Sequence, residues 1–146
     1  MNKQFILLLL PITLWSCTSS YTSYERRLKT INPDLLQNDF VIIIPNEGCG
    51  GCISGATQFI QDNITGMIER NTSIIFTGIK DYKLFKNQVG QEFIQNRQVL
   101  IDSSDLFMHQ EVYSIYPQLI HLESKRVVAK ESFDPNTSLK FITQEK

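Results

Sequence analysis

A continuous run of apolar, mostly β-branched residues, Phe40-Val41-Ile42-Ile43-Ile44, is the feature that most limits how this chain can fold. A run without polar alternation is typical of a strand that is buried on both faces. After Cys49 the apolar residues recur at spacings of three and four, the period of an amphipathic helix, at Ile53, Ala56, Ile60, Ile64 and Met67. A buried strand that leads into such a helix favours an α/β fold.

The rest of the chain repeats this alternation of strands and helices. We expect further strands at 73–79 and 98–102, helices at 81–89 and 104–112, a hairpin with strands at 118–122 and 126–131, and a closing helix at 133–142. The alternation implies parallel strands, and the hairpin adds antiparallel ones. The expected architecture is a mixed central sheet flanked by helices, with a C-terminal β-hairpin plus helix.

The N-terminus has the pattern of an export signal. Lys3 precedes an apolar run over residues 5–15, which is shorter than the ~20 residues of a transmembrane helix. The run ends in Leu14-Trp15-Ser16-Cys17, which resembles the lipobox of bacterial lipoproteins. That resemblance implies a signal peptide over 1–16 and a lipid on Cys17. An ordinary signal peptide with a chance cysteine, or a buried hydrophobic segment, are the alternatives.

The expected domain organisation follows from this signal. Residues 17–36 are polar, rich in Ser, Thr and Tyr, and broken at Asn32-Pro33, so we expect a lipid-anchored tether. Residues 37–146 form the expected folded domain. We expect the protein to lie in the bacterial cell envelope, where it faces the periplasm and contacts the membrane through its lipid. Thr18, by analogy with the enterobacterial sorting rule, favours the outer membrane.

The two remaining cysteines form a Cys49-Gly50-Gly51-Cys52 motif between the strand and the helix. The unsatisfied N–H groups and the dipole of a helix N-terminus favour a thiolate, which is the nucleophile in disulfide exchange. Two intervening residues let both sulfur atoms meet within one turn. We therefore expect Cys49 to attack a substrate disulfide and Cys52 to resolve the mixed disulfide.

Ser114-Ile115-Tyr116-Pro117 precedes the predicted hairpin. Together with the strand–CxxC–helix unit, it resembles the thioredoxin superfamily, in particular the membrane-tethered oxidoreductases of the bacterial envelope. The resemblance extends from Asp39 to Lys146. It implies a thioredoxin-like fold, a cis-proline at Pro117 beside the cysteine pair, and a Tyr116 backbone that pairs with an extended substrate. It also implies protein thiol or disulfide substrates, a partner that recharges the dithiol, and no metal or organic cofactor.

The chain departs from thioredoxin itself at three positions. Gly48 replaces the tryptophan before the first cysteine, Gly51 replaces the proline between the cysteines, and Ile43 replaces the buried acid of the preceding strand. Glu47 is the carboxylate nearest to Cys49 in sequence and is a candidate proton relay, although a solvated loop acid is the alternative. These departures leave it undecided whether the protein reduces, oxidises or isomerises the disulfides of its substrates.

Other functions have less support in the sequence. With 14 basic and 15 acidic residues the formal net charge is −1, so no basic stripe favours nucleic-acid binding. A structural zinc site needs four ligands, and the only histidines, His109 and His121, do not complete one. A peroxide scavenger would need Thr and Arg residues that are absent around Cys49. The main alternative is a non-catalytic binding module in which Cys49 and Cys52 form a structural disulfide.

Overall fold

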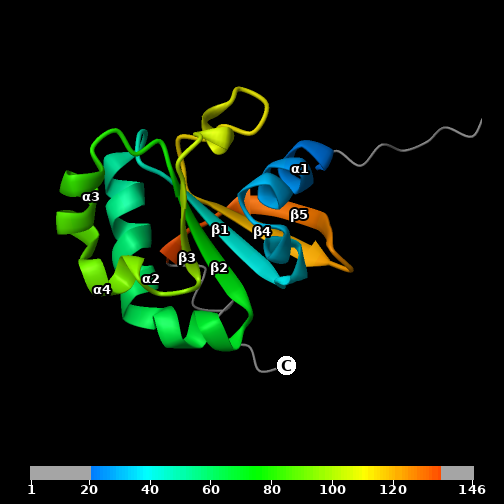
Figure 1. The fold of residues 1–146 in the computed structure, drawn as a ribbon, viewed down its shortest axis with the longest axis horizontal. Helices are drawn as coiled ribbons and strands as arrows, with labels where there is room; N and C mark the ends of the chain where they lie inside the picture. Colours follow the sequence, from blue (N-terminus) through cyan, green and yellow to red (C-terminus); the bar gives the residue numbers. More distant parts are fainter. Residues whose placement is uncertain (1–20, 136–146) are drawn as a thin grey trace, which may run out of the picture.

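The computed structural model describes residues 21–135, which are built around one mixed, five-stranded sheet (Figure 1). The strands are β1 (Phe40–Pro45), β2 (Thr72–Thr77), β3 (Val99–Asp102), β4 (Gln118–Glu123) and β5 (Arg126–Ser132). They lie in the order β3-β2-β1-β4-β5, where β1, β2 and β3 are parallel, β4 is antiparallel to β1, and β5 is antiparallel to β4. The predicted α/β class and mixed sheet are therefore confirmed.

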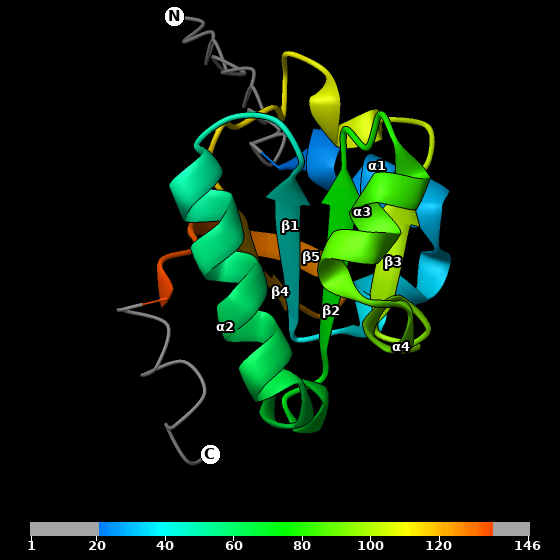
Figure 2. The ribbon, with the colours of Figure 1, turned by 90° about the vertical axis from the view of Figure 1, so that its left-hand side faces the viewer.

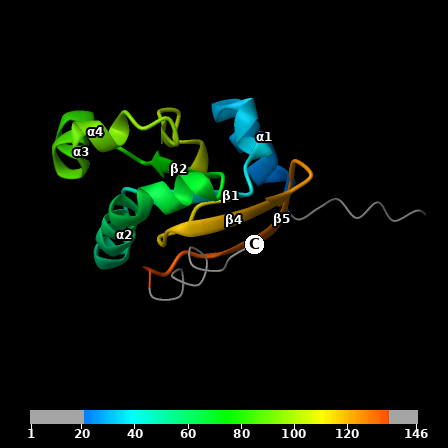
Figure 3. The ribbon, with the colours of Figure 1, turned by 90° about the horizontal axis from the view of Figure 1, so that it is seen from below.

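Helices flank both faces of this sheet. On one face lie α2 (Gly50–Glu69), α3 (Tyr82–Val89) and α4 (Gln91–Ile94), as Figure 2 shows. On the other face lie α1 (Thr22–Ile31) and the short 3₁₀ helices η1 (Pro33–Gln37) and η2 (Leu106–Met108). Figure 3 shows α1 and α2 separated by the sheet. The two faces have separate hydrophobic clusters, so the sheet is covered on both sides.

The strand β1 shows why its sequence has no polar alternation. Successive side chains of a strand point to opposite faces. Ile42 and Ile44 belong to the cluster under α2, whereas Val41 and Ile43 belong to the cluster under α1. All four are at most 3% exposed. Because neighbouring strands flank β1 on both edges, it occupies the centre of the sheet and fixes where α2 begins.

The tether predicted over residues 17–36 is wrong for the part that the structure describes. Residues 22–31 form α1, in which Tyr24 and Leu28 are 4% and 0% exposed and pack on the sheet. Leu35 of η1 extends the same cluster. Tyr21, Ile31 and Leu36 pack against this cluster as well, and the Ser- and Thr-rich composition concealed the helical spacing of the apolar residues. The folded domain therefore includes α1 and η1.

The helix predicted at 104–112 is also wrong, because only the three residues of η2 are helical there. Asp105 has φ +52°, a left-handed conformation that interrupts a right-handed helix. The Asp102 carboxylate also accepts a hydrogen bond from the Phe107 N–H (2.9 Å), which holds this segment as a loop. The predicted closing helix at 133–142 lies almost wholly outside the described residues, as do the signal peptide and Cys17.

Candidate functional site

Cys49 and Cys52 form a disulfide at the start of α2, where their Cα atoms are 5.2 Å apart. Cys49 is the N-cap residue of α2 and its side chain makes no capping hydrogen bond. The first N–H groups of the helix therefore have no side-chain acceptor there, and they can stabilise a thiolate once the disulfide is reduced. Both cysteines are half-buried and the two glycines between them are exposed, so the pair lies at the surface of the protein.

The loop before Pro117 lies directly against the loop before Cys49. The Cys49 N–H donates a hydrogen bond to the Ile115 carbonyl (3.0 Å). Gly48 has φ +138°, and a Cβ atom at this position would come within 2.4 Å of the Ile115 oxygen. Only glycine permits both this backbone conformation and this close approach. The glycine at position 48, where the resemblance had suggested a tryptophan, thus has a local structural reason.

Tyr116 and Pro117 line the same groove as Cys52. The cis bond that the resemblance implied at Pro117 is wrong. No peptide bond within residues 21–135 is cis, so the bond between Tyr116 and Pro117 is trans. In this arrangement the Pro117 carbonyl accepts a hydrogen bond from the Phe133 N–H (2.8 Å). The Ser114 hydroxyl accepts one from the Tyr116 N–H (3.0 Å). The trans bond is the common isomer, and the resemblance alone had suggested the other.

A groove with a volume of about 610 Å³ opens next to the disulfide. Its walls come from α2, from the loop that precedes β4, and from the chain that leaves β5. The lining residues are mostly apolar or lack a side chain: Gly51, Cys52, Gly55, Tyr116, Pro117, Ser132, Phe133, Asp134 and Pro135. Apolar grooves of this size that contain a reactive group are typical ligand sites.

The candidate proton relay, Glu47, forms an ion pair with Lys80. The hydrogen bond from Lys80 to Glu47, together with the charge of Glu47, raises the pKa of the Lys80 ammonium above its ordinary value. The Lys80 side chain is 82% exposed, so this ion pair lies in solvent. The structure thus gives Glu47 a partner other than the cysteines, and its role as a relay stays a prediction.

The sequence analysis treated Asp102 only as the end of a strand, yet it is a buried carboxylate, 3% exposed. It accepts hydrogen bonds from the Thr77 hydroxyl (2.8 Å) and from the Phe107 N–H. Nearby, Asp105 accepts a hydrogen bond from the Gly78 N–H (3.0 Å). These bonds connect the carboxyl ends of β2 and β3 to the loop that leads towards Tyr116. A polar residue at the last position of a buried strand was the available sequence signal.

The same loop is attached to α1 on its other side. The Tyr24 hydroxyl donates to the Val112 carbonyl (3.2 Å) or to Oε1 of Gln118 (3.0 Å). Arg27 donates to the Leu106 carbonyl (2.8 Å) and forms an ion pair with Glu111 (3.0 Å). Hydrogen bonds from Ser23 and Arg27 lower the pKa of the Glu111 carboxyl. Helix α1 therefore supports the loop that forms one wall of the groove.

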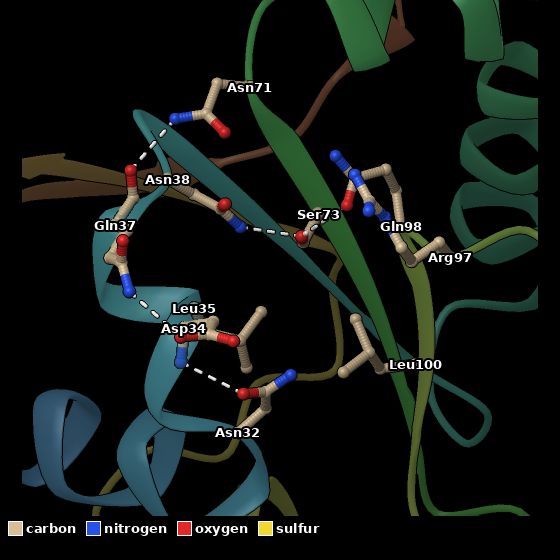
Figure 4. A pocket seen from close by; sticks show the side chains of 10 residues that line it. All are labelled: Asn32, Asp34, Leu35, Gln37, Asn38, Asn71, Ser73, Arg97, Gln98 and Leu100. Atoms are coloured by element: carbon tan, nitrogen blue, oxygen red, sulfur yellow. Dashed lines mark hydrogen bonds between the residues drawn. The ribbon is translucent and has the colours of Figure 1, made fainter.

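A second hollow, of about 400 Å³, lies at the opposite end of the sheet, where β1, β2 and β3 begin (Figure 4). Its lining is polar: Asn32, Asp34, Gln37, Asn38, Asn71, Ser73, Arg97 and Gln98, with Leu35 and Leu100. Asn38 donates to Ser73 (2.6 Å), Gln37 donates to Asp34 (2.9 Å), and Asn71 donates to the Gln37 carbonyl (2.9 Å). Most of these groups thus satisfy one another and fasten η1 to the sheet.

No family model matches the chain, and no curated protein or solved structure is significantly similar to it. Within residues 21–135, no helix is both long and apolar enough to cross a membrane. The same residues contain no group of three or more His, Cys, Asp or Glu side chains that could hold a metal ion. The site is therefore interpreted from its own geometry.

Proposed function

We propose that the protein is a lipid-anchored, extracytoplasmic thiol–disulfide oxidoreductase with a thioredoxin-like fold, which uses the Cys49–Cys52 pair on protein substrates. The observation that carries this proposal is the half-buried disulfide at the start of α2, which has no side-chain cap, beside an apolar groove. A disulfide that closes so short a loop restrains little chain entropy, so stabilisation is a weak reason for it.

The reaction that we propose begins with the reduced pair. The Cys49 thiolate attacks one sulfur of a substrate disulfide, which forms a mixed disulfide and releases the first substrate thiolate. The Cys52 thiolate then attacks Sγ of Cys49, which closes the Cys49–Cys52 bond and releases the second substrate thiolate. Two electrons pass from the dithiol to the substrate, and two protons end on its thiols. A separate redox partner must then reduce the pair again, and no metal or organic cofactor is required.

The surroundings of the cysteines support distinct roles for them. Cys49 occupies the N-cap, where the helix N–H groups favour its thiolate, so it is the proposed nucleophile. Cys52 lines the groove, close to the position that a bound substrate would take. Tyr116 and Pro117 form the opposite wall, and we propose that they dock the substrate backbone.

A trapping experiment tests the enzymatic proposal. In Cys52→Ala the mixed disulfide cannot be resolved, so Cys49 should remain linked to partner proteins in complexes that dithiothreitol releases. Cys49→Ala is the matched control and should trap none. Wild type should also reduce insulin, whereas both variants should lose this activity by on the order of 100-fold or more. Absence of both exchange and trapping would favour the non-catalytic binding module.

The anchor is tested separately from the redox chemistry. Labelled palmitate should enter the wild-type protein and not Cys17→Ala, while the purified variant keeps its insulin-reducing activity. Incorporation into both proteins would show that Cys17 is not the site of lipidation, and the redox proposal would stand.

A further inference from the structure

Helix α2 has three exposed glycines where the fold does not require glycine, Gly50, Gly51 and Gly55, and the last two line the groove beside the disulfide. Gly51 and Gly55 have helical backbone angles, and a Cβ atom added at either would meet no other atom within 4 Å. Glycine is a poorer helix former than alanine, because it loses more backbone freedom on folding. Helix stability alone therefore favours a larger residue at both positions.

The two glycines have a common location. They are four residues apart, so they lie on the same face of α2. Both line the groove that also contains Cys52, Tyr116 and Pro117. At these two glycines the groove is bordered by helix backbone that carries no side chains. Phe133 and Pro135 give the groove apolar surface at other positions of its lining. Any side chain at Gly55 would project into this space and reduce its volume.

We propose that Gly51 and Gly55 determine substrate specificity by leaving room for a bulky apolar side chain of the substrate polypeptide beside its disulfide. This inference rests on the proposed function and extends it to a substrate class. The occupant must be the polypeptide that is bonded to Cys49 during exchange, because the groove is continuous with the disulfide through Cys52. The apolar lining favours an aliphatic or aromatic side chain next to the reacting cysteine.

Gly55 provides the cleaner test, since Gly51 lies between the cysteines and its replacement would alter their chemistry directly. Gly55→Leu should fill the bare wall of the groove. Ser54→Leu is the matched control: Ser54 is the adjacent exposed residue of α2 and lines a different hollow. Gly55→Ala should raise Tm by about 2–6 °C, because alanine favours the helix and meets no clash.

The assay uses protein that has been reduced with dithiothreitol and desalted, so that each molecule donates two electrons once. Three disulfides serve as probes: bis(2-hydroxyethyl) disulfide and two disulfide-linked peptide dimers, which carry either Phe or Gly next to the cysteine. Wild type should reduce the Phe peptide about tenfold faster than the Gly peptide. Gly55→Leu should lose this preference, while Ser54→Leu should retain both the preference and the wild-type rate with the small disulfide.

The outcomes separate this inference from the proposed function. Equal rates of wild type with both peptides would overturn the inference and leave the oxidoreductase proposal standing. The same would follow if Ser54→Leu and Gly55→Leu lost the preference equally, because added bulk anywhere on α2 would then explain it. If reduced wild type reacted with none of the three probes, both proposals would fall together.

Discussion

The two ends of the parallel strands each border a hollow, and the two hollows differ in the polarity of the side chains that line them. At the amino ends, the hollow beneath η1 is lined by amide and hydroxyl groups that hydrogen-bond to one another, as between Asn38 and Ser73. At the carboxyl ends, the groove beside Cys52 is mainly apolar and bordered by bare helix backbone. Groups that satisfy each other stabilise the fold, whereas an apolar surface left open beside a disulfide is suited to a partner.

The loops at the two ends also differ in how closely they are held. At the carboxyl ends, the loop over residues 103–117 is fixed by Asp102, by α1 and by the hydrogen bond between Cys49 and Ile115. At the amino ends, η1 is held by hydrogen bonds between partly exposed side chains. We therefore expect substitutions at the disulfide end to reduce stability more than equivalent substitutions at the other end.

The largest stability difference is expected between two glycines that both have positive φ. Gly48→Ala adds backbone strain and a clash with the Ile115 carbonyl, so it should lower the free energy of unfolding by about 3–4 kcal/mol. Gly90, with φ +84°, has no atom within 4 Å of an added Cβ. Gly90→Ala should therefore cost only about 1–2 kcal/mol of strain. Urea denaturation measures both, and equal losses would show that the Ile115 contact contributes nothing.

The next largest effect is expected for two polar residues, one at each end of the strands, of which Asp102 is buried and Asn38 half-buried. Asp102→Ala leaves the Thr77 hydroxyl and the Phe107 N–H without an acceptor, so it should cost about 3 kcal/mol. Asn38→Ala, at the other end, should cost about 1 kcal/mol because its partner Ser73 keeps a second hydrogen bond, to Gln98.

Asp102→Asn is the control for shape, since both hydrogen bonds end on Oδ2 of Asp102 and the amide oxygen of asparagine can take the place of that atom. It should cost less than Asp102→Ala in the same denaturation experiment. A loss as large as that of Asp102→Ala would show that the negative charge, and not hydrogen bonding, holds the loop.

The smallest effect concerns the exposed Glu47–Lys80 ion pair. Glu47 raises the pKa of Lys80 in the folded protein, so the pair stabilises the fold below the unfolded-state pKa of lysine and this contribution is lost as pH rises through the folded-state pKa. The denaturation midpoints of wild type and Glu47→Gln should differ slightly at pH 8 and converge above pH ~11. Nitrogen NMR of Lys80 should show its pKa falling in the variant, and an unchanged pKa would contradict the pairing.

Sequence reasoning succeeded where a strong pattern coincided with deep burial. The β-branched residues of β1 and the regularly spaced apolar residues of α2 belong to the hydrophobic clusters, so the periodicity of each segment correctly predicted its secondary structure. The position of Tyr116 and Pro117 near the cysteines was an expectation from the family resemblance, and both residues line the groove that contains Cys52.

The errors arose where single tertiary contacts decide the local structure. Helix α1 packs on the sheet through Tyr24 and Leu28, but most of its residues are polar, and this composition led to the prediction of a tether. The segment after Asp102 has helical composition, but one carboxylate and the left-handed Asp105 hold it as a loop. The groove was not predicted because three segments that are distant in sequence form it. One of its walls is formed by glycines of α2, so no side chain in the sequence marks it.

The packing of α1 onto the sheet limits how far the domain can move if Cys17 carries a lipid. Only four residues, 18–21, separate Cys17 from the first residue of α1, Thr22. Four extended residues reach about 15 Å, which is less than the width of a small domain. The domain would then diffuse laterally with the bilayer surface below it, and it would meet substrates that project only a short distance from that surface.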